Sequence, residues 1–124
     1  MNFFNNSELT SAGKIGEASF SEVFTFLQSN AETPARIVMK VIPFGCSMLV
    51  NESAQPSVRD IWTEVKITTA LGSGEICEYT DGFIGVVGAK VIQGRYPQVL
   101  IDEWTRWDEE VKETENESPS TYPY

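Results

Sequence analysis

The chain has 124 residues, of which 41% are hydrophobic, so it is long enough for one small domain that buries roughly two-thirds of its unfolded surface. Its formal charge of −9 argues against extended contact with nucleic-acid phosphates, and the absence of histidine excludes histidine-based catalytic triads. No apolar run is long enough to span a bilayer, and residues 1–10 lack a signal-peptide pattern, so we expect a soluble, intracellular protein without membrane contact.

The first elements expected along the chain are a lead-in and a β-hairpin. Residues 1–11 are largely polar and predict a flexible lead-in. Residues 14–16 and 23–28 carry β-prone apolar side chains and predict two strands. Small residues between these strands favour a tight turn, in which backbone N–H groups can approach a bulky anion such as a phosphate.

This turn matches part of the protein-kinase glycine-rich loop, G-x-G-x-x-G-x-V. Gly16 stands at the first glycine and Val23 at the valine, whereas Ala18 and Ser21 replace the second and third glycines. An ordinary hairpin is the alternative interpretation of this stretch when it is read alone.

A third strand and a helix follow the hairpin. Residues 36–44 predict an apolar strand that contains Lys40, and a lysine at such a position either reaches water or meets a carboxylate. Residues 57–71 predict a helix, because a capping-box pattern precedes it and a glycine follows its last apolar residue. Glu64 lies beside the apolar face of this helix, so its carboxylate is expected near the packing side.

The other segments are less regular. The two cysteines, Cys46 and Cys77, do not have metal-site or redox-motif spacing, so no metal site is expected. The remaining expectations are an irregular insertion at 45–56, a helical turn at 76–79, a glycine-interrupted strand at 83–93, a helix-like pattern at 99–107 and an acidic disordered tail at 108–124.

A glycine-containing hairpin, a strand lysine and a helix glutamate follow one another in the order of the protein-kinase small lobe. Several stretches resemble haspin-type serine/threonine kinases more specifically: KIGE at 14–17, LVN at 49–51, SGEIC at 73–77, GFIG at 82–85, VIQGRYP at 91–97, DEW at 102–104, and Trp107. The resemblance implies an α+β small lobe over residues 12–107, with an antiparallel β-sheet and one main helix, truncated before the hinge.

The resemblance also implies an ATP site. Lys40 would contact the α- and β-phosphates, and Glu64 would hold Lys40 in place. Phe20 at the tip of the hairpin would shield the γ-phosphate from water. The other residues expected at the nucleotide are Gly16, Ala18 and Ser21 beside the phosphates, and Ile15, Val23 and Val38 over adenine; the last three also suit an ordinary strand core.

No sequence like H-R-D or D-F-G occurs in the chain, so neither a catalytic loop nor a magnesium site is expected, and Mg²⁺ would bind only with a large lobe. We therefore expect the chain alone to be inactive in phosphate transfer. The resemblance implies a histone tail as partner, phosphorylation of a histone threonine, and a nuclear or chromosomal location. The alternative functions are a non-catalytic binding or regulatory module and a non-functional remnant.

Overall fold

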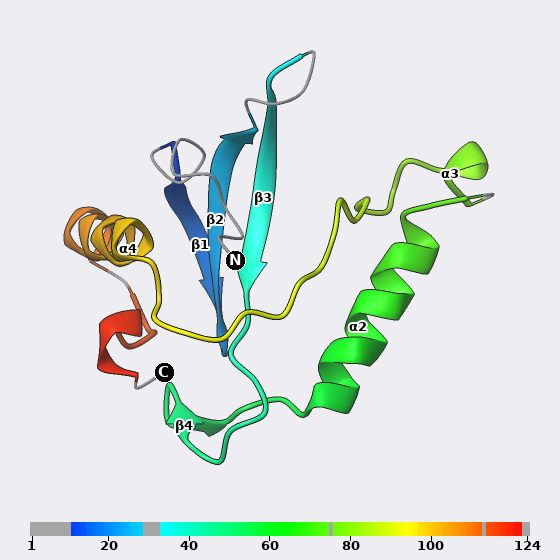
Figure 1. The fold of residues 1–124 in the computed structure, drawn as a ribbon. Helices are drawn as coiled ribbons and strands as arrows, with labels where there is room; N and C mark the ends of the chain where they lie inside the picture. The colour runs from blue at the N-terminus through cyan, green and yellow to red at the C-terminus, as the bar shows by residue number, and fades with distance from the viewer. Residues whose placement is uncertain (1–10, 29–32, 75, 113, 123–124) are drawn as a thin grey trace.

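The computed structural model describes residues 11–28, 33–74, 76–112 and 114–122 (Figure 1). Three antiparallel strands form the main sheet in the order β1-β2-β3: β1 (Gly13–Ala18), β2 (Ser21–Gln28) and β3 (Ala35–Val41). The other elements are the short hairpin β4 (Leu49–Val50) and β5 (Ser53–Ala54), the helices α2 (Val58–Leu71), α3 (Ile76–Tyr79) and α4 (Gln98–Val111), and the 3-10 helix η1 (Pro119–Thr121). The expected α+β fold with an antiparallel sheet is confirmed.

The register of the sheet decides which side chains share a face. Val23 of β2 lies opposite Gly16 of β1 on one side and opposite Lys40 of β3 on the other. Val38 is two residues from Lys40 along β3, so strand alternation places it on the same face. The β1–β2 register shifts between Lys14 and Gly16, which is a bulge.

The core lies on the opposite face of the sheet, under α4. Phe24 of β2 is completely buried, and Leu100 and Trp104 of α4 are buried as well. These two α4 residues are four positions apart, so they lie on one side of the helix. Figure 1 shows α4 beside β1, where it covers one side of the sheet.

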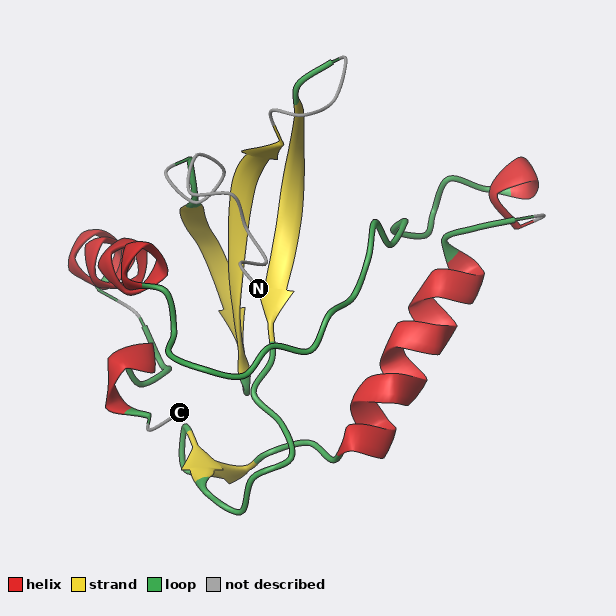
Figure 2. Cartoon of the chain, in the orientation of Figure 1, coloured by secondary structure: helices red, strands yellow, loops and turns green. Residues whose placement is uncertain are grey.

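Helix α2 stands apart from the sheet (Figures 1 and 2). None of its residues is buried, and Trp62 and Ile67 are more than half exposed. The helix nevertheless forms where the sequence predicts it, because Ser57 and Asp60 make a reciprocal capping box at its N-terminus. The hydrogen bond from the Ser57 side chain, followed by that from its backbone N–H, lowers the pKa of the Asp60 carboxyl.

The prediction of a strand at 83–93 is wrong. These residues run as an exposed, irregular segment between α3 and α4, without strand pairing to any part of the chain that the structure describes (Figure 2). A strand forms only where its N–H and C=O groups find a neighbouring ladder, and the two glycines of this segment, Gly85 and Gly88, weaken its strand preference. The third strand also ends earlier than expected, at Val41, and the insertion at 45–56 contains the β4–β5 hairpin.

The C-terminal residues differ from the expected disordered tail. Helix α4 continues to Val111, and η1 forms at Pro119–Thr121. Asn116 and Pro119 are buried, because this segment lies against the main sheet and the β4–β5 hairpin through hydrogen bonds described below. The lead-in at 1–11 lies outside the described residues except for Ser11, whose hydroxyl accepts a hydrogen bond from the backbone N–H of Leu27.

The end of α2 depends on a close backbone approach at Gly72. A Cβ added to Gly72 would overlap the Ile84 carbonyl oxygen and lie 2.9 Å from the Cα of Gly85. We expect Gly72→Ala to lower the free energy of unfolding by about 1–3 kcal/mol, since backbone atoms must shift to admit the methyl group. Chemical denaturation would measure the change.

Gly88→Ala is the matched control, because a Cβ at Gly88 meets no heavy atom within 4 Å. It should leave stability unchanged or raise it slightly, since alanine restricts the unfolded chain more than glycine does. Equal losses in the two variants would contradict the close-approach argument.

The capping box makes the stability of α2 depend on pH. Because the pKa of Asp60 is lowered below its ordinary 3.8, its contribution is complete above that value and is lost as pH falls through the lower folded pKa. We therefore expect wild type to exceed Asp60→Asn in thermal midpoint at about pH 7, and the difference to shrink at about pH 3. A difference that is independent of pH would rule out a role for the carboxylate charge.

Candidate functional site

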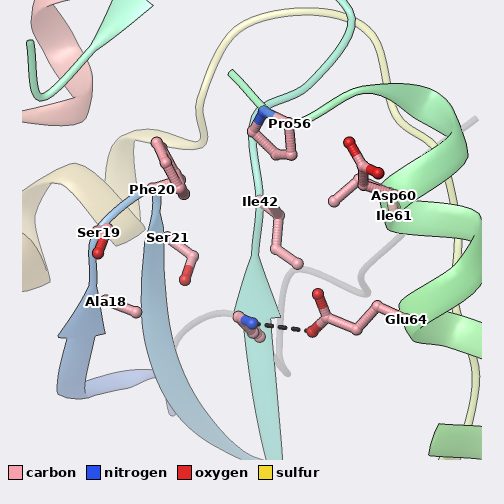
Figure 3. Close-up of a pocket in the computed structure, with 10 residues that line it drawn as sticks. Ala18, Ser19, Phe20, Ser21, Ile42, Pro56, Asp60, Ile61 and Glu64 are labelled. Atoms are coloured by element: carbon pink, nitrogen blue, oxygen red, sulfur yellow. Dashed lines mark hydrogen bonds and ion pairs between the residues drawn. The ribbon is translucent and has the colours of Figure 1, made fainter. Parts of the chain in front are cut away.

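The site begins with an ion pair between the sheet and α2. The Nζ atom of Lys40 lies 2.9 Å from Oε1 of Glu64, although 24 residues separate them in the sequence. Strand β3 directs Lys40 away from the α4 side, and the second turn of α2 carries Glu64. Figure 3 shows this contact as a dashed line that ends on the Glu64 carboxylate.

The pair is too exposed to contribute much to stability. The side chains of Lys40 and Glu64 are 44% and 52% exposed, so water screens their attraction. Exposed ion pairs of this kind contribute roughly 0–1 kcal/mol. The ammonium therefore remains accessible to an anionic ligand.

A cavity of about 250 Å³ lies between the β1–β2 turn and α2 (Figure 3). We call residues 18–21, which make that turn and one wall of the cavity, the flap turn. The cavity is lined by Ala18, Ser19, Phe20, Ser21, Lys40, Ile42, Pro56, Asp60, Ile61 and Glu64. Its volume is below the roughly 300–1,000 Å³ of complete small-molecule sites, so it suits one end of a larger ligand.

The structure gathers five of the predicted site residues around this cavity: Ala18, Phe20, Ser21, Lys40 and Glu64. The other four lie outside its lining. Val23 is nevertheless directly across from Lys40, and Val38 is on the same face and 61% exposed. These valines extend the sheet surface away from the ion pair.

Gly16 and Ile15 lie at the bulge of β1. Gly16 pairs with Val23, and a Cβ at Gly16 would meet nothing within 4 Å, so the space beside its Cα is open. Ile15 falls at the shift in register and is half exposed. The register thus brings Gly16 to the face of Val23 and Lys40, while the bulge leaves Ile15 outside the regular alternation.

Sequence reasoning missed the other five cavity residues: Ser19, Ile42, Pro56, Asp60 and Ile61. Asp60 could have been predicted from its spacing, since it precedes Glu64 by one helical turn and therefore lies on the same side of α2. Pro56 carried none, because its position depends on how the insertion leads into the helix.

The chemistry available here is anion binding beside carboxylates. Lys40 offers an ammonium with three donors, and the flap turn, with small residues at three of its four positions, lines the same cavity. Among the described residues, no group of three or more Cys, Asp and Glu side chains is placed to hold a metal ion. Cys46 and Cys77 are exposed free thiols, and none of the described helices is long and apolar enough to cross a membrane.

Comparison of the sequence with known proteins shows what this chain is similar to. No family model matches the chain. Among curated proteins it is 31% identical over 122 residues to the serine/threonine-protein kinase haspin of Bos taurus, covering 97% of this chain and 15% of that protein. It is 35% identical over 119 residues to the haspin homolog hrk1 of Schizosaccharomyces pombe, covering 96% of this chain and 21% of the relative.

The haspin homolog of Drosophila melanogaster is 29% identical over 124 residues, with 96% of this chain and 22% of the relative covered. The chain thus spans 15% to 22% of the length of these relatives. The resemblance noted in the sequence is confirmed, and the chain is a homologue of one segment of the haspin-like serine/threonine kinases.

Proposed function

We propose that the chain binds ATP through the small-lobe half of a kinase nucleotide site, in which Lys40 contacts the α- and β-phosphates. The single observation that carries this proposal is the 2.9 Å contact between Lys40 and Glu64 beside the cavity. In kinases a strand lysine paired with a helix glutamate performs this role. Homology to haspin-like kinases supports the same assignment.

The flap turn is assigned to the phosphates. Its backbone, with Gly16 before it, approaches the phosphate oxygens, and Phe20 shields the γ-phosphate from water. Ala18, Phe20 and Ser21 all line the cavity that Lys40 also lines, which supports this arrangement. The Cβ atoms of Ala18 and Ser21 narrow the range of backbone conformations that the turn can adopt.

The exposed surface beside the ion pair is assigned to adenine. Val23 and Val38 lie on the Lys40 face of the sheet, and Ile15 is exposed at the neighbouring bulge. Val38 and Ile15 are open to solvent beside the partly exposed Val23, and apolar side chains next to a cationic group suit a ligand with a flat apolar ring and an anionic tail. ATP has both parts: its adenine would lie over the valines and its phosphates would lie at Lys40.

We further propose that this chain does not transfer phosphate by itself. It has no H-R-D-like or D-F-G-like sequence to orient a substrate hydroxyl or to hold magnesium ions. In a longer protein with a large lobe, the family relation supports ATP- and Mg²⁺-dependent phosphorylation of a serine or threonine, with a histone tail in the nucleus as the substrate that the resemblance implies.

The ATP proposal predicts that Lys40→Ala weakens ATP binding at least about tenfold, since a charge-assisted contact to phosphate is lost. The thermal midpoint should change little, because the ion pair is exposed. Isothermal titration calorimetry with ATP would measure the affinity. Lys66→Ala is the control, since Lys66 is an exposed lysine of α2 that does not line the cavity; equal affinities of wild type and Lys40→Ala would reject the assignment.

The proposed lack of transfer predicts no ³²P incorporation into a histone H3 tail peptide when the purified chain is incubated with labelled ATP and Mg²⁺. A transfer activity that Lys40→Ala abolishes would show that this chain holds a complete catalytic site. A residual signal that survives Lys40→Ala would instead point to a contaminating kinase.

A further inference from the structure

Two asparagine side chains hold the flap turn from outside the hairpin. Asn116 donates from Nδ2 to the carbonyl oxygen of Ala18 at 3.0 Å, and Asn51 donates from Nδ2 to the carbonyl oxygen of Ser19 at 3.1 Å. They lie 98 and 32 residues away from these partners in the sequence. The turn is therefore fixed through its own carbonyls by two remote segments.

Asn116 contacts both strands at the base of the turn. Its Nδ2 also donates to Oε1 of Glu22 at 2.9 Å, and it lies 3.5 Å from the carbonyl oxygen of Ser21. An amide nitrogen carries two hydrogens, so the two short contacts, to Ala18 and Glu22, use its full donor capacity. The side chain is buried, which favours this arrangement over hydrogen bonds to water.

Asn51 is in turn held by the C-terminal residues 114–122, which we call the strap. The backbone N–H of Glu117 donates to Oδ1 of Asn51 at 2.8 Å, and the N–H of Asn51 donates to the Tyr122 hydroxyl at 3.1 Å. The Tyr122 hydroxyl is protonated near neutral pH at its ordinary pKa of 10.0, and burial raises that pKa further. The strap thus supports both contacts to the flap turn, one directly and one through Asn51.

The backbone conformation at Asn51 also suits an asparagine. Asn51 and Glu52 have φ values of 50° and 61°, in the left-handed region. Asparagine adopts this region more readily than most residues, and the conformation lets the β4–β5 hairpin turn tightly beside the flap turn. The same side chain that tolerates the turn also reaches Ser19.

We propose that Asn51 and Asn116 are positioning residues that set the flap turn in its binding conformation before the nucleotide arrives, so that the strap determines nucleotide affinity. This inference rests on the proposed ATP site. The chain has alanine and serine where glycines would allow the turn to fold over a ligand, and a turn held in advance has less conformational freedom to lose on binding. The two carboxamides supply that restraint.

The test uses Asn116→Asp in the full chain, because this nearly isosteric change removes both donors and places a second carboxylate beside Glu22. Without nucleotide, hydrogen exchange of the flap-turn amides should rise about tenfold, while exchange within the β2–β3 pairing stays unchanged. ATP affinity by calorimetry should fall by about three- to tenfold.

Gln98→Glu is the matched control. Gln98 donates from Nε2 to Oδ1 of Asp102 at 2.9 Å on the exposed side of α4, so the variant makes the same amide-to-carboxylate change beside a carboxylate, remote from the flap turn. It should alter neither the exchange of the flap turn nor ATP affinity.

Asn51→Asp provides a second variant if Asn116→Asp fails to fold. It keeps the acceptor for Glu117 and suits the left-handed conformation, but it loses the donor to Ser19. Faster exchange of the flap turn together with weaker ATP binding supports the inference. Unchanged exchange, or faster exchange with unchanged affinity, overturns it. Absence of ATP binding by wild type rejects the proposed function, whereas the nucleotide-free exchange experiment still decides whether the asparagines hold the turn.

Discussion

The arrangement of the chain depends on the buried contacts of the Lys14 ammonium. Its side chain is fully buried, where it meets the carboxylates of Glu17 and Glu22 and lies 5.4 Å from the centre of the Trp107 ring. These contacts join β1 to β2 and to α4, and Glu22 extends them to Asn116 of the strap. Removing one partner from such a buried pair typically costs about 3–5 kcal/mol, because the other charge is left without compensation.

The second lysine of the sheet has the opposite character. Lys40 also meets a glutamate, but that pair is exposed and links the sheet to a helix that buries none of its own residues. A contact of this kind contributes little to stability, so the Lys40 ammonium stays accessible to the nucleotide that we propose. The two faces of the sheet thus differ in role. On one face Lys14 and α4 stabilise the fold, and on the other the ammonium of Lys40, paired with Glu64 of α2, lines the cavity.

Local patterns were sufficient for much of the site. The capping box of Ser57 and Asp60 and the strand around Lys40 each depend on a few neighbouring residues. The meeting of Lys40 with Glu64, 24 residues away, was expected from the resemblance to kinases, and the structure brings the two side chains together. The prediction of a strand at 83–93 was wrong because a strand needs a neighbouring strand for its hydrogen bonds, which local residue preference does not supply. The acidic residues after 107 suggested disorder, yet α4 continues through 111 and Asn116 is buried beyond it.

The sequence by itself determined the hairpin with its small-residue turn and the capped helix, because periodicity and capping act over a few residues. The α+β class and the pairing of Lys40 with Glu64 were expected from the resemblance to kinases, not from local pattern. Only the tertiary structure decided the burial of Lys14 and the contacts of Asn51 and Asn116 with the flap turn. These contacts join residues up to 98 positions apart. The sequence does not tell whether an asparagine side chain meets water or a buried carbonyl. Only the folded chain places an acceptor beside its amide donors.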